Sequence, residues 1–517
     1  LKILIKLPIS SKRFSTQPIF PKIKIICKST LTRDKVEELE PNLVWSHFQK
    51  ITEIPRCSGN EEEIRDYIIS VAEDNGYETK VDNTGNVVVK KPATTDTNAP
   101  VTVLQGHMDM VCEKDESSDH DFSKDPIPWK REGDWITAEG TTLGADNGIG
   151  IAFSLGLIEK DDLAHGPFEF LFTVGEETGL DGAKELKPGM LEGKTLINLD
   201  SEEFGSFTIG CAGSGDSKLS LPLEFQKTQS EKTFELSITG LHGGHSGLDI
   251  DKGGANAIKV LGRLLWELND DHDMDFKIYG IQGGNKRNAI PREAKVIFGT
   301  KTKAEDKVKQ KLMEIFSKIK NEYESVEENM QMTFEETDIE KSRGLSFAES
   351  KKVIDLIRAL PHGVMFMSQE VPDLVRTSTN LAVVSLEEEG LNITMMTRSS
   401  SPSELKSIRD RIKTITKRFG GIVDEDEAYP GWEPQTDSDI LRLAKKTYED
   451  LTGEEPNIEA LHAGLETALI GEKFEEMDMI SMGATIENPH STDERLEVDS
   501  VGKTWDMIVE ILENKAK

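Results

Sequence analysis

Histidines and acids recur in this chain directly after short apolar segments that are typical of β-strands. Four such motifs lie far apart along the chain: Gly106-His107-Met108-Asp109, Gly175-Glu176-Glu177, Asn198-Leu199-Asp200 and Asn488-Pro489-His490. A fifth motif, containing Asp146, precedes a helix pattern, where an aspartate is an ordinary N-cap. In an open α/β sheet, ligands bind outside the carboxyl ends of the strands. The sequence therefore predicts an α/β domain in which distant segments meet at one edge of a sheet.

The expected elements support that domain in two separate parts of the chain. Near-continuous apolar strands are predicted at 84–90, 101–105, 168–174, 195–199 and 478–484. Helices are predicted at 43–55, 60–75, 147–160, 437–452, 464–474 and 500–515. Apolar strands separated by helices indicate a buried, largely parallel sheet.

The middle of the chain, residues 230–430, has more amphipathic strands and reads as an α+β insertion. Strands are predicted at 233–240, 275–282, 293–300, 330–336, 382–387 and 391–398, with helices at 254–268, 303–323, 347–359 and 402–419. The insertion is about twice the size of one small α+β unit, which suggests an internal duplication, such as two ferredoxin-like halves. The expected domains are a leader (1–34), a catalytic domain in two parts (35–213 and 429–517) and a lid (214–428).

Composition limits the classes of partner. The net charge of −32 argues against a broad nucleic-acid surface and against anionic membranes. No apolar run approaches the length that spans a bilayer. The four cysteines form no CxxC pair, which predicts neither a disulfide framework nor a zinc ribbon and suits the reducing cytoplasm. Cys112 is expected to be a small buried side chain.

The first 33 residues differ from the rest, because they carry eight lysines and arginines and no acid. Such a leader resembles an organelle transit peptide, and a mitochondrial or other organellar location would follow from it. A disordered extension is the alternative.

Each motif has a simpler explanation when it stands alone. An HxD sequence at a strand end is often a polar turn, and paired glutamates are often surface charge. Together they resemble the M20 metallopeptidases, within them the aminoacyl-histidine dipeptidases, from about residue 36 to the C-terminus. Besides the five motifs, the resemblance is carried by Gly243-Gly244-His245-Ser246-Gly247, Tyr429-Pro430-Gly431-Trp432, His462-Ala463-Gly464-Leu465-Glu466 and Ser491-Thr492-Asp493-Glu494-Arg495.

The resemblance implies a dinuclear metallo-dipeptidase that hydrolyses short unblocked peptides, with aminoacyl-histidine dipeptides as the expected substrates. Asp146 would bridge two divalent ions and would be followed by a cis peptide bond. Glu177 and His490 would complete the protein ligands of one ion. His107 and Asp200 would complete those of the other. Histidine and carboxylate ligands suit Zn²⁺ first, with Mn²⁺ and Co²⁺ as alternatives.

The resemblance also implies roles beside the metals. Asp109 would orient His107 as an outer-shell carboxylate. Glu176 would act as general base on a water activated between the metals, and then as general acid toward the leaving amine. His245 corresponds to a lid histidine that contacts the substrate carbonyl or the tetrahedral intermediate. His242 remains the alternative to it.

The expected substrate-binding residues come mostly from the lid. Asn288 lies in an Asn-x-Ile-Pro segment like that of the family, and Asn380 precedes Arg398 in the second half of the lid. Arg398 is expected to pair with the terminal carboxylate of a dipeptide, unless it is a solvated strand residue. Gly464 would bring backbone N–H groups to the same carboxylate. The second half of the lid would then replace a neighbouring subunit, although a monomer and a homodimer both stay open.

Two other functions compete with a dipeptidase. Another M20 activity, such as a tripeptidase, aminoacylase or amidohydrolase, would use the same ligands and differ in the lid. A non-catalytic metal-binding scaffold is the alternative of a different class. Glu176 argues against the scaffold, because a protein without catalysis could lose the base and keep its ligands.

Overall fold

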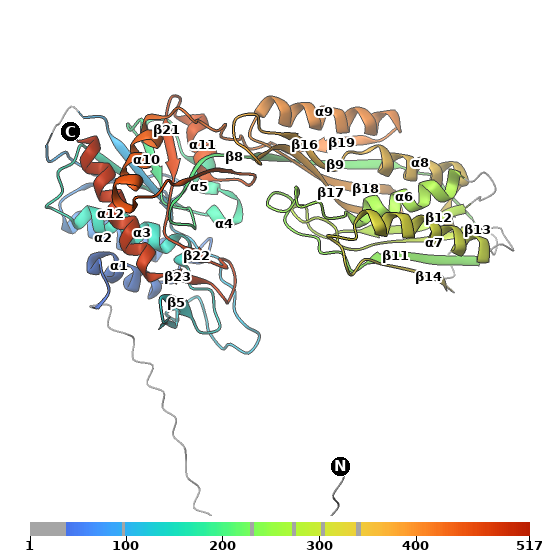
Figure 1. Ribbon diagram of the computed structural model, residues 1–517, viewed down its shortest axis with the longest axis horizontal. Helices are drawn as coiled ribbons and strands as arrows, with labels where there is room; N and C mark the ends of the chain where they lie inside the picture. Colours follow the sequence, from blue (N-terminus) through green and yellow to red (C-terminus); the bar gives the residue numbers. More distant parts are fainter. Residues whose placement is uncertain are drawn as a thin grey trace, which may run out of the picture.

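The computed structural model describes residues 38–95, 99–227, 232–270, 276–300, 305–337 and 343–516. The chain forms an α/β body and an elongated lid that lie side by side (Figure 1). Each part has a hydrophobic cluster of its own. The predicted leader, 1–34, lies outside the described residues.

The α/β body is built on an eight-stranded mixed sheet. Its order is β1 (Glu78–Val81), β2 (Val87–Lys91), β6 (Phe168–Thr173), β3 (Thr102–His107), β7 (Thr195–Asn198), β21 (Asp478–Ser481), β8 (Ser206–Cys211) and β20 (Asn457–Leu461). The central strands β6, β3, β7 and β21 are parallel to one another. The predicted α/β class with a mixed sheet is confirmed.

Helices cover both faces of this sheet. One face packs on α1 (Asn42–Thr52), α2 (Glu62–Asp74), α3 (Ala145–Glu159), α10 (Asp439–Thr452) and α12 (Val498–Lys515). The other face meets α5 (Asp181–Glu185) and α11 (Glu466–Lys473). Because both faces are covered, β3, β6 and β7 are buried along their whole length, which explains their continuous apolar sequences.

A small antiparallel sheet ties the end of the chain to the loop before α3. Its order is β22 (Ile486–Glu487), β23 (Arg495–Glu497), β5 (Trp135–Ala138) and β4 (Trp129–Glu132). The sequence does not predict this sheet, because its strands are only two to four residues long.

The lid contains one nine-stranded antiparallel sheet. Its order is β14 (Gln331–Thr337), β11 (Lys232–Thr239), β13 (Ala294–Thr300), β12 (Phe276–Gly283), β17 (Val375–Glu387), β18 (Gly390–Ser399), β9 (Gly213–Pro222) and β19 (Ile422–Glu425), with β16 (Gly363–Met367) beside β17. Its helices are α6 (Ala257–Asp270), α7 (Glu305–Glu322), α8 (Phe347–Ala359) and α9 (Pro402–Arg418).

These lid elements form two βαββαβ units of the ferredoxin-like kind. The first unit runs β11-α6-β12-β13-α7-β14, and the second runs β9-α8-β17-β18-α9-β19. The units are nested rather than consecutive, because the first lies in the chain between β9 and α8 of the second. They meet where β12 pairs with β17, so a single sheet crosses both units.

Most predicted elements are found within a few residues of their expected limits. The predicted strand 382–387 is the end of the longer β17, whose first half is rich in serine, threonine and asparagine. Strands β8 and β9 were not predicted. In the described part of the chain, no helix has the length and hydropathy needed to cross a membrane.

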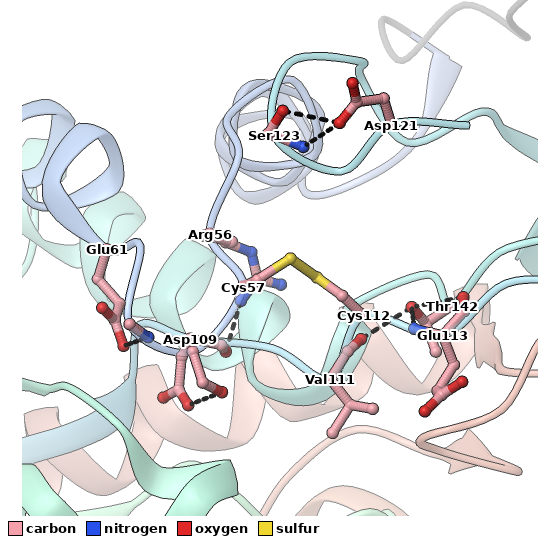
Figure 2. Close-up of a disulfide and its surroundings, with 12 residues drawn as sticks. Arg56, Cys57, Glu61, Asp109, Val111, Cys112, Glu113, Asp121, Ser123 and Thr142 are labelled. Carbon is pink, nitrogen blue, oxygen red and sulfur yellow. Dashed lines mark hydrogen bonds between the residues drawn. A yellow bond between two sulfur atoms is a disulfide. The ribbon is translucent and has the colours of Figure 1, made fainter. Parts of the chain in front are cut away.

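The prediction that Cys112 is a small buried side chain is wrong. Cys57 and Cys112 form a disulfide, with their Cα atoms 5.7 Å apart (Figure 2). The pair forms because a β-bridge joins Cys57 to Met110 and sets two loops side by side. A separation of 55 residues gives no sign of this in the sequence. Cys112 is half-buried and paired, whereas Cys211 is free and buried.

Candidate metal centre

Three neighbouring parallel strands bring predicted site residues to one edge of the sheet. His107 is the last residue of β3, and Asp200 lies two residues after the end of β7. Glu176 and Glu177 follow β6 but begin the short helix α4 (Glu176–Gly179) instead of ending the strand. Because β6, β3 and β7 are adjacent and parallel, their carboxyl ends meet.

Asp146 and His490 reach the same point from other elements. Asp146 lies in the first turn of α3 with non-helical backbone angles, and its peptide bond to Asn147 is cis. It is not the N-cap of α3, since that position belongs to Gly144. His490 lies in the loop between β22 and β23, so it comes from the small sheet rather than directly from β21.

The two carboxylate oxygens of Asp146 face two different histidines. Oδ1 lies 3.0 Å from His107 Nε2, and Oδ2 lies 3.1 Å from His490 Nε2. Each histidine has a second acid beside it: Asp200 Oδ1 is 3.2 Å from His107 Nε2, and Glu177 Oε2 is 3.0 Å from His490 Nε2. Asp146 is therefore shared between two histidine–carboxylate pairs.

The donor atoms suit a divalent cation. Ligand atoms of His107, Asp146 and Glu177 all lie within 4.8 Å of one another. Imidazole nitrogen and carboxylate oxygen are ligands of Zn²⁺, Mn²⁺ and Co²⁺. The three carboxylates of Asp146, Glu177 and Asp200 would repel one another at this separation without a compensating positive charge. The site residues therefore fit the metal centre that the sequence predicts.

Asp109 connects several parts of the site. It is fully buried, and its Oδ1 lies 3.4 Å from His107 Nδ1, on the far side of the ring from Asp146. Its carboxylate also accepts hydrogen bonds from the backbone N–H groups of Glu176 and Glu177 and from Ser58 Oγ. Burial raises the pKa of Asp109, but the hydrogen bonds from His107 and Ser58 outweigh it and lower the value to about 2.

Glu176 has surroundings that favour its protonated form more than those of an ordinary carboxylate. Burial raises its pKa well above the ordinary value, and the charges of Asp200 and Glu466 add to this, while His107 opposes it. A carboxylate whose pKa approaches the operating pH is a more effective general base and acid.

Glu466 ends the His462–Glu466 motif, and the sequence alone predicts no role for it. It is completely buried, and its Oε2 accepts hydrogen bonds of 2.6 Å from both Gln105 Nε2 and Thr173 Oγ1. Burial raises its pKa to about 7, with His107 opposing. Gln105 lies two residues before His107 on β3, so Glu466 supports the strand end that carries a predicted ligand.

A second cluster of predicted residues lies on the lid. Arg398 Nη2 is 3.3 Å from His245 Nε2, and Arg398 Nε donates to Ser246 Oγ. Arg398 is 4% exposed, and no described carboxylate lies within ion-pair distance of it. Burial lowers the pKa of His245, and the charge of Arg398 lowers it further, which favours the neutral ring.

Asn288 and Asn380 border this cluster. The Asn288 carbonyl accepts from Ser246 N at 2.8 Å, and Asn380 Nδ2 donates to the carbonyl of Ala289, also at 2.8 Å. Asn380 Oδ1 is buried and has no partner. The structure therefore brings Asn288, Asn380, His245 and Arg398 together.

The alternative histidine, His242, has different surroundings. Its side chain is 63% exposed, and its Nδ1 lies 3.2 Å from the buried Glu327. Both histidines line one lid cavity of about 790 Å³, but only His245 contacts Arg398.

One loop of the α/β body connects the lid cluster with the sheet edge. His462 Nε2 lies 2.7 Å from Ser378 Oγ of β17, while Glu466 at the other end of the loop contacts β3 and β6. Gly464 lies between them, where a Cβ atom would be 2.6 Å from the Tyr429 hydroxyl. Only glycine fits there without displacing Tyr429, which is hydrogen-bonded to Arg398.

The fold and this donor set define a class of protein, a metal-dependent hydrolase built on a mixed α/β sheet with an inserted lid. Similarity to known proteins places the chain more narrowly within that class. The chain is 38% identical over 484 residues to the cytosol non-specific dipeptidase of Escherichia coli K12, covering 92% of this chain and 98% of that protein. The crystal structure of aminoacylhistidine dipeptidase from Vibrio alginolyticus matches with a TM-score of 0.86 and 38% identity, covering 93% of this chain and 98% of that one.

A family model described as a peptidase dimerisation domain, M20_dimer, matches residues 229–327, most of the first lid unit. The aminopeptidase PepT of Bacillus cereus shares the fold, with a TM-score of 0.53 at 18% identity over 93% of this chain and all of that one. The chain belongs to the M20 metallopeptidases, as the sequence motifs predict.

Proposed function

We propose that this protein is a dinuclear metallo-dipeptidase that hydrolyses short unblocked peptides, with aminoacyl-histidine dipeptides as preferred substrates. The observation that carries the proposal is the sharing of the two Asp146 oxygens between His107 and His490. In this proposal Asp200 completes the ligands of one ion and Glu177 those of the other. The 38% identity to two dipeptidases supports the substrate class. Zn²⁺ is the first candidate ion, with Mn²⁺ and Co²⁺ as alternatives.

Two ions bound here would lower the pKa of a water molecule and polarise the scissile carbonyl. Glu176 then accepts the proton of the attacking water and passes it to the leaving amine, which its raised pKa favours. Asp109 holds His107 by its Nδ1 side, which would leave Nε2 free to bind an ion. Asp109 also holds the backbone at Glu176, so one carboxylate positions both a ligand and the base.

Substrate binding is assigned to the lid cluster. Arg398 is buried without a carboxylate partner among the described residues, which suits pairing with the terminal carboxylate of a dipeptide. His245, beside it, donates to the developing oxyanion. Asn288 and Asn380 shape the same pocket, and Gly464 lets the backbone approach the carboxylate.

We further propose that the catalytic domain comprises 35–213 and 429–517, with residues 214–428 as the lid. Because Arg398 of the second lid unit contacts His245 of the first unit, one chain holds both groups. A homodimer is the alternative that the dimerisation-domain match supports.

A cytoplasmic location is proposed from the name of the Escherichia coli relative. The Cys57–Cys112 disulfide counts against it, because disulfides are rare in a reducing compartment. The organellar alternative depends on the basic leader.

A dipeptide panel tests the function. Metal-free protein is loaded with Zn²⁺, Mn²⁺ or Co²⁺ and assayed on Xaa-His dipeptides, other dipeptides, tripeptides and N-acyl amino acids. We expect Xaa-His dipeptides to give the highest kcat/KM, and Glu176→Gln to lower kcat by roughly 10²- to 10⁴-fold while the protein still binds metal. Faster cleavage of tripeptides or N-acyl amino acids would favour another M20 activity. Metal uptake without any hydrolysis would favour a scaffold.

A further inference from the structure

Glu494 is a buried carboxylate that receives a row of backbone N–H groups beside the candidate metal centre. It is 2% exposed and lies four residues after His490. Its Oε2 accepts from Leu143 N at 2.7 Å and from Gly144 N at 2.9 Å. Its Oε1 accepts from Ala145 N at 2.7 Å and faces Asp146 N at 3.4 Å. Both oxygens are therefore used as acceptors.

The geometry of the turn explains why these N–H groups need such a partner. Gly144 has a φ of 69°, in the left-handed region, and Asp146 departs from helical angles. The first amides of α3 therefore converge toward one point, and no N-cap side chain bonds to them. Buried N–H groups without an acceptor are costly, and here a side chain from a distant segment accepts them.

Arg56 holds the same turn from its carbonyl side. Its guanidinium donates to the carbonyl of Gly144 and, at 3.1 and 2.8 Å, to those of Met108 and Asp109. Arg56 is almost completely buried. The turn before Asp146 is thus held between a cation on its carbonyl groups and an anion on its N–H groups.

The location of Glu494 links two segments that carry proposed ligands. The small sheet pairs β23 with β5, which sets the His490–Glu494 segment against the loop that leads to Asp146. The N–H groups lie 348 to 351 residues before Glu494 in the chain. A shift of this turn would move the Asp146 carboxylate away from both His107 and His490.

We propose that Glu494 is a positioning residue: it fixes the backbone turn of Asp146 so that this carboxylate can serve both ions. The inference rests on the metal centre proposed above. Glutamine at this position would keep the length but replace one acceptor oxygen by an NH₂ group facing N–H donors. Aspartate would keep two acceptor oxygens but shorten the side chain by one CH₂ group.

The test compares wild-type protein with Glu494→Gln, Glu494→Asp and, as control, Asp499→Asn. Asp499 lies close by in the chain, and its exposed carboxylate pairs with Lys503 on the surface. Metal-free protein is titrated with Co²⁺ or Mn²⁺, and ion stoichiometry, the metal dependence of dipeptide hydrolysis and thermal unfolding without metal are measured.

We expect Glu494→Gln to weaken metal binding by about 10- to 100-fold, the usual range for loss of an outer-shell partner. The ion concentration that gives half-maximal activity rises by the same factor, while KM for the dipeptide at saturating metal is unchanged. The metal affinity of the Glu494→Asp protein should lie between those of Glu494→Gln and wild type. The Asp499→Asn protein should bind metal with wild-type affinity.

Two results would overturn the inference. The first is Glu494→Gln protein that binds two ions with wild-type affinity. The second applies if that variant does not fold: Glu494→Asp protein with a lowered unfolding temperature but unchanged metal affinity would reduce Glu494 to a structural helix cap. A wild-type protein that binds no metal would overturn the proposed function as well, and this is seen before any variant is compared.

Discussion

Three carboxylates in this molecule each serve several partners, and each is largely removed from solvent. Asp109 accepts from two backbone N–H groups and Ser58, Glu494 accepts from the turn before α3, and Asp146 faces two histidines. A buried charge is tolerated only when hydrogen-bond partners replace its lost hydration. Each acid therefore ties separate segments of the chain together, and the site geometry depends on all three.

Substitution of Arg398 tests its proposed contact with the substrate carboxylate. A charge-assisted bidentate pair with the substrate carboxylate is worth about 1.5–3 kcal/mol. Arg398→Ala should therefore lower kcat/KM for a dipeptide by roughly 10- to 100-fold, mostly through KM. The matched control is the same dipeptide as its C-terminal amide, which lacks the carboxylate and should be affected little. Equal losses on both substrates would mean that Arg398 only packs against His245.

The disulfide joins two separate parts of the fold, the loop after α1 and the segment after β3. Cys57 lies next to Arg56 and Ser58, and Cys112 lies three residues after Asp109, so the cross-link braces two loops that contact the site (Figure 2). Closing a loop of 55 residues stabilises the fold by about 4 kcal/mol in the chain-entropy description. The double variant Cys57→Ser/Cys112→Ser should therefore unfold at a lower temperature.

Calorimetry with and without a thiol reductant checks this prediction. Reductant should bring the wild-type midpoint down to that of the double variant and leave the variant unchanged. A wild-type midpoint that does not respond to reductant would show that the pair is not cross-linked in solution or adds no stability.

The strands of the α/β body could be predicted from the sequence, because their apolar runs end in polar motifs. His107 and Asp200 indeed lie at the carboxyl ends of adjacent parallel strands. The nested lid could not be predicted, because hydrophobic periodicity marks strands but carries no information on their order in a sheet. The supporting contacts of Arg56 and Glu494 were also missed, since their partners are backbone groups, which have no signature in the sequence.

For the whole molecule, the loop from His462 to Glu466 links the two parts of the proposed site. One end contacts Ser378 in the lid, and the other supports β3 and β6 below the proposed metal ligands. Gly247 of the lid approaches this loop so closely that a Cβ atom would lie 2.2 Å from the His462 carbonyl oxygen. Because each part has its own hydrophobic core, contacts of this kind hold the lid cluster in place.

The stability of the whole fold should depend on the protonation of buried histidines. His47 is 5% exposed, and burial lowers its pKa to about 4, although Glu159 lies 3.6 Å away. The folded state therefore binds the proton less readily than the unfolded state, whose histidine has a pKa near 6.5. The neutral His47 ring therefore makes its full contribution to the free energy of unfolding above pH 6.5. That contribution is lost as the pH falls from about 6.5 to about 4. Protonation of this one residue lowers the free energy of unfolding by on the order of 3 kcal/mol.

Thermal unfolding of wild type and His47→Gln between pH 7.5 and 4 isolates this contribution, because the other titrating groups are common to both proteins. Glutamine can still bond to the Tyr67 hydroxyl, which lies 2.8 Å from His47 Nδ1, but it does not titrate. The wild-type midpoint should fall more steeply than that of the variant below pH 6.5, and the two curves should run parallel above it. Parallel curves over the whole range would mean that His47 is protonated without cost in the folded state, through Glu159 or through local opening of α1.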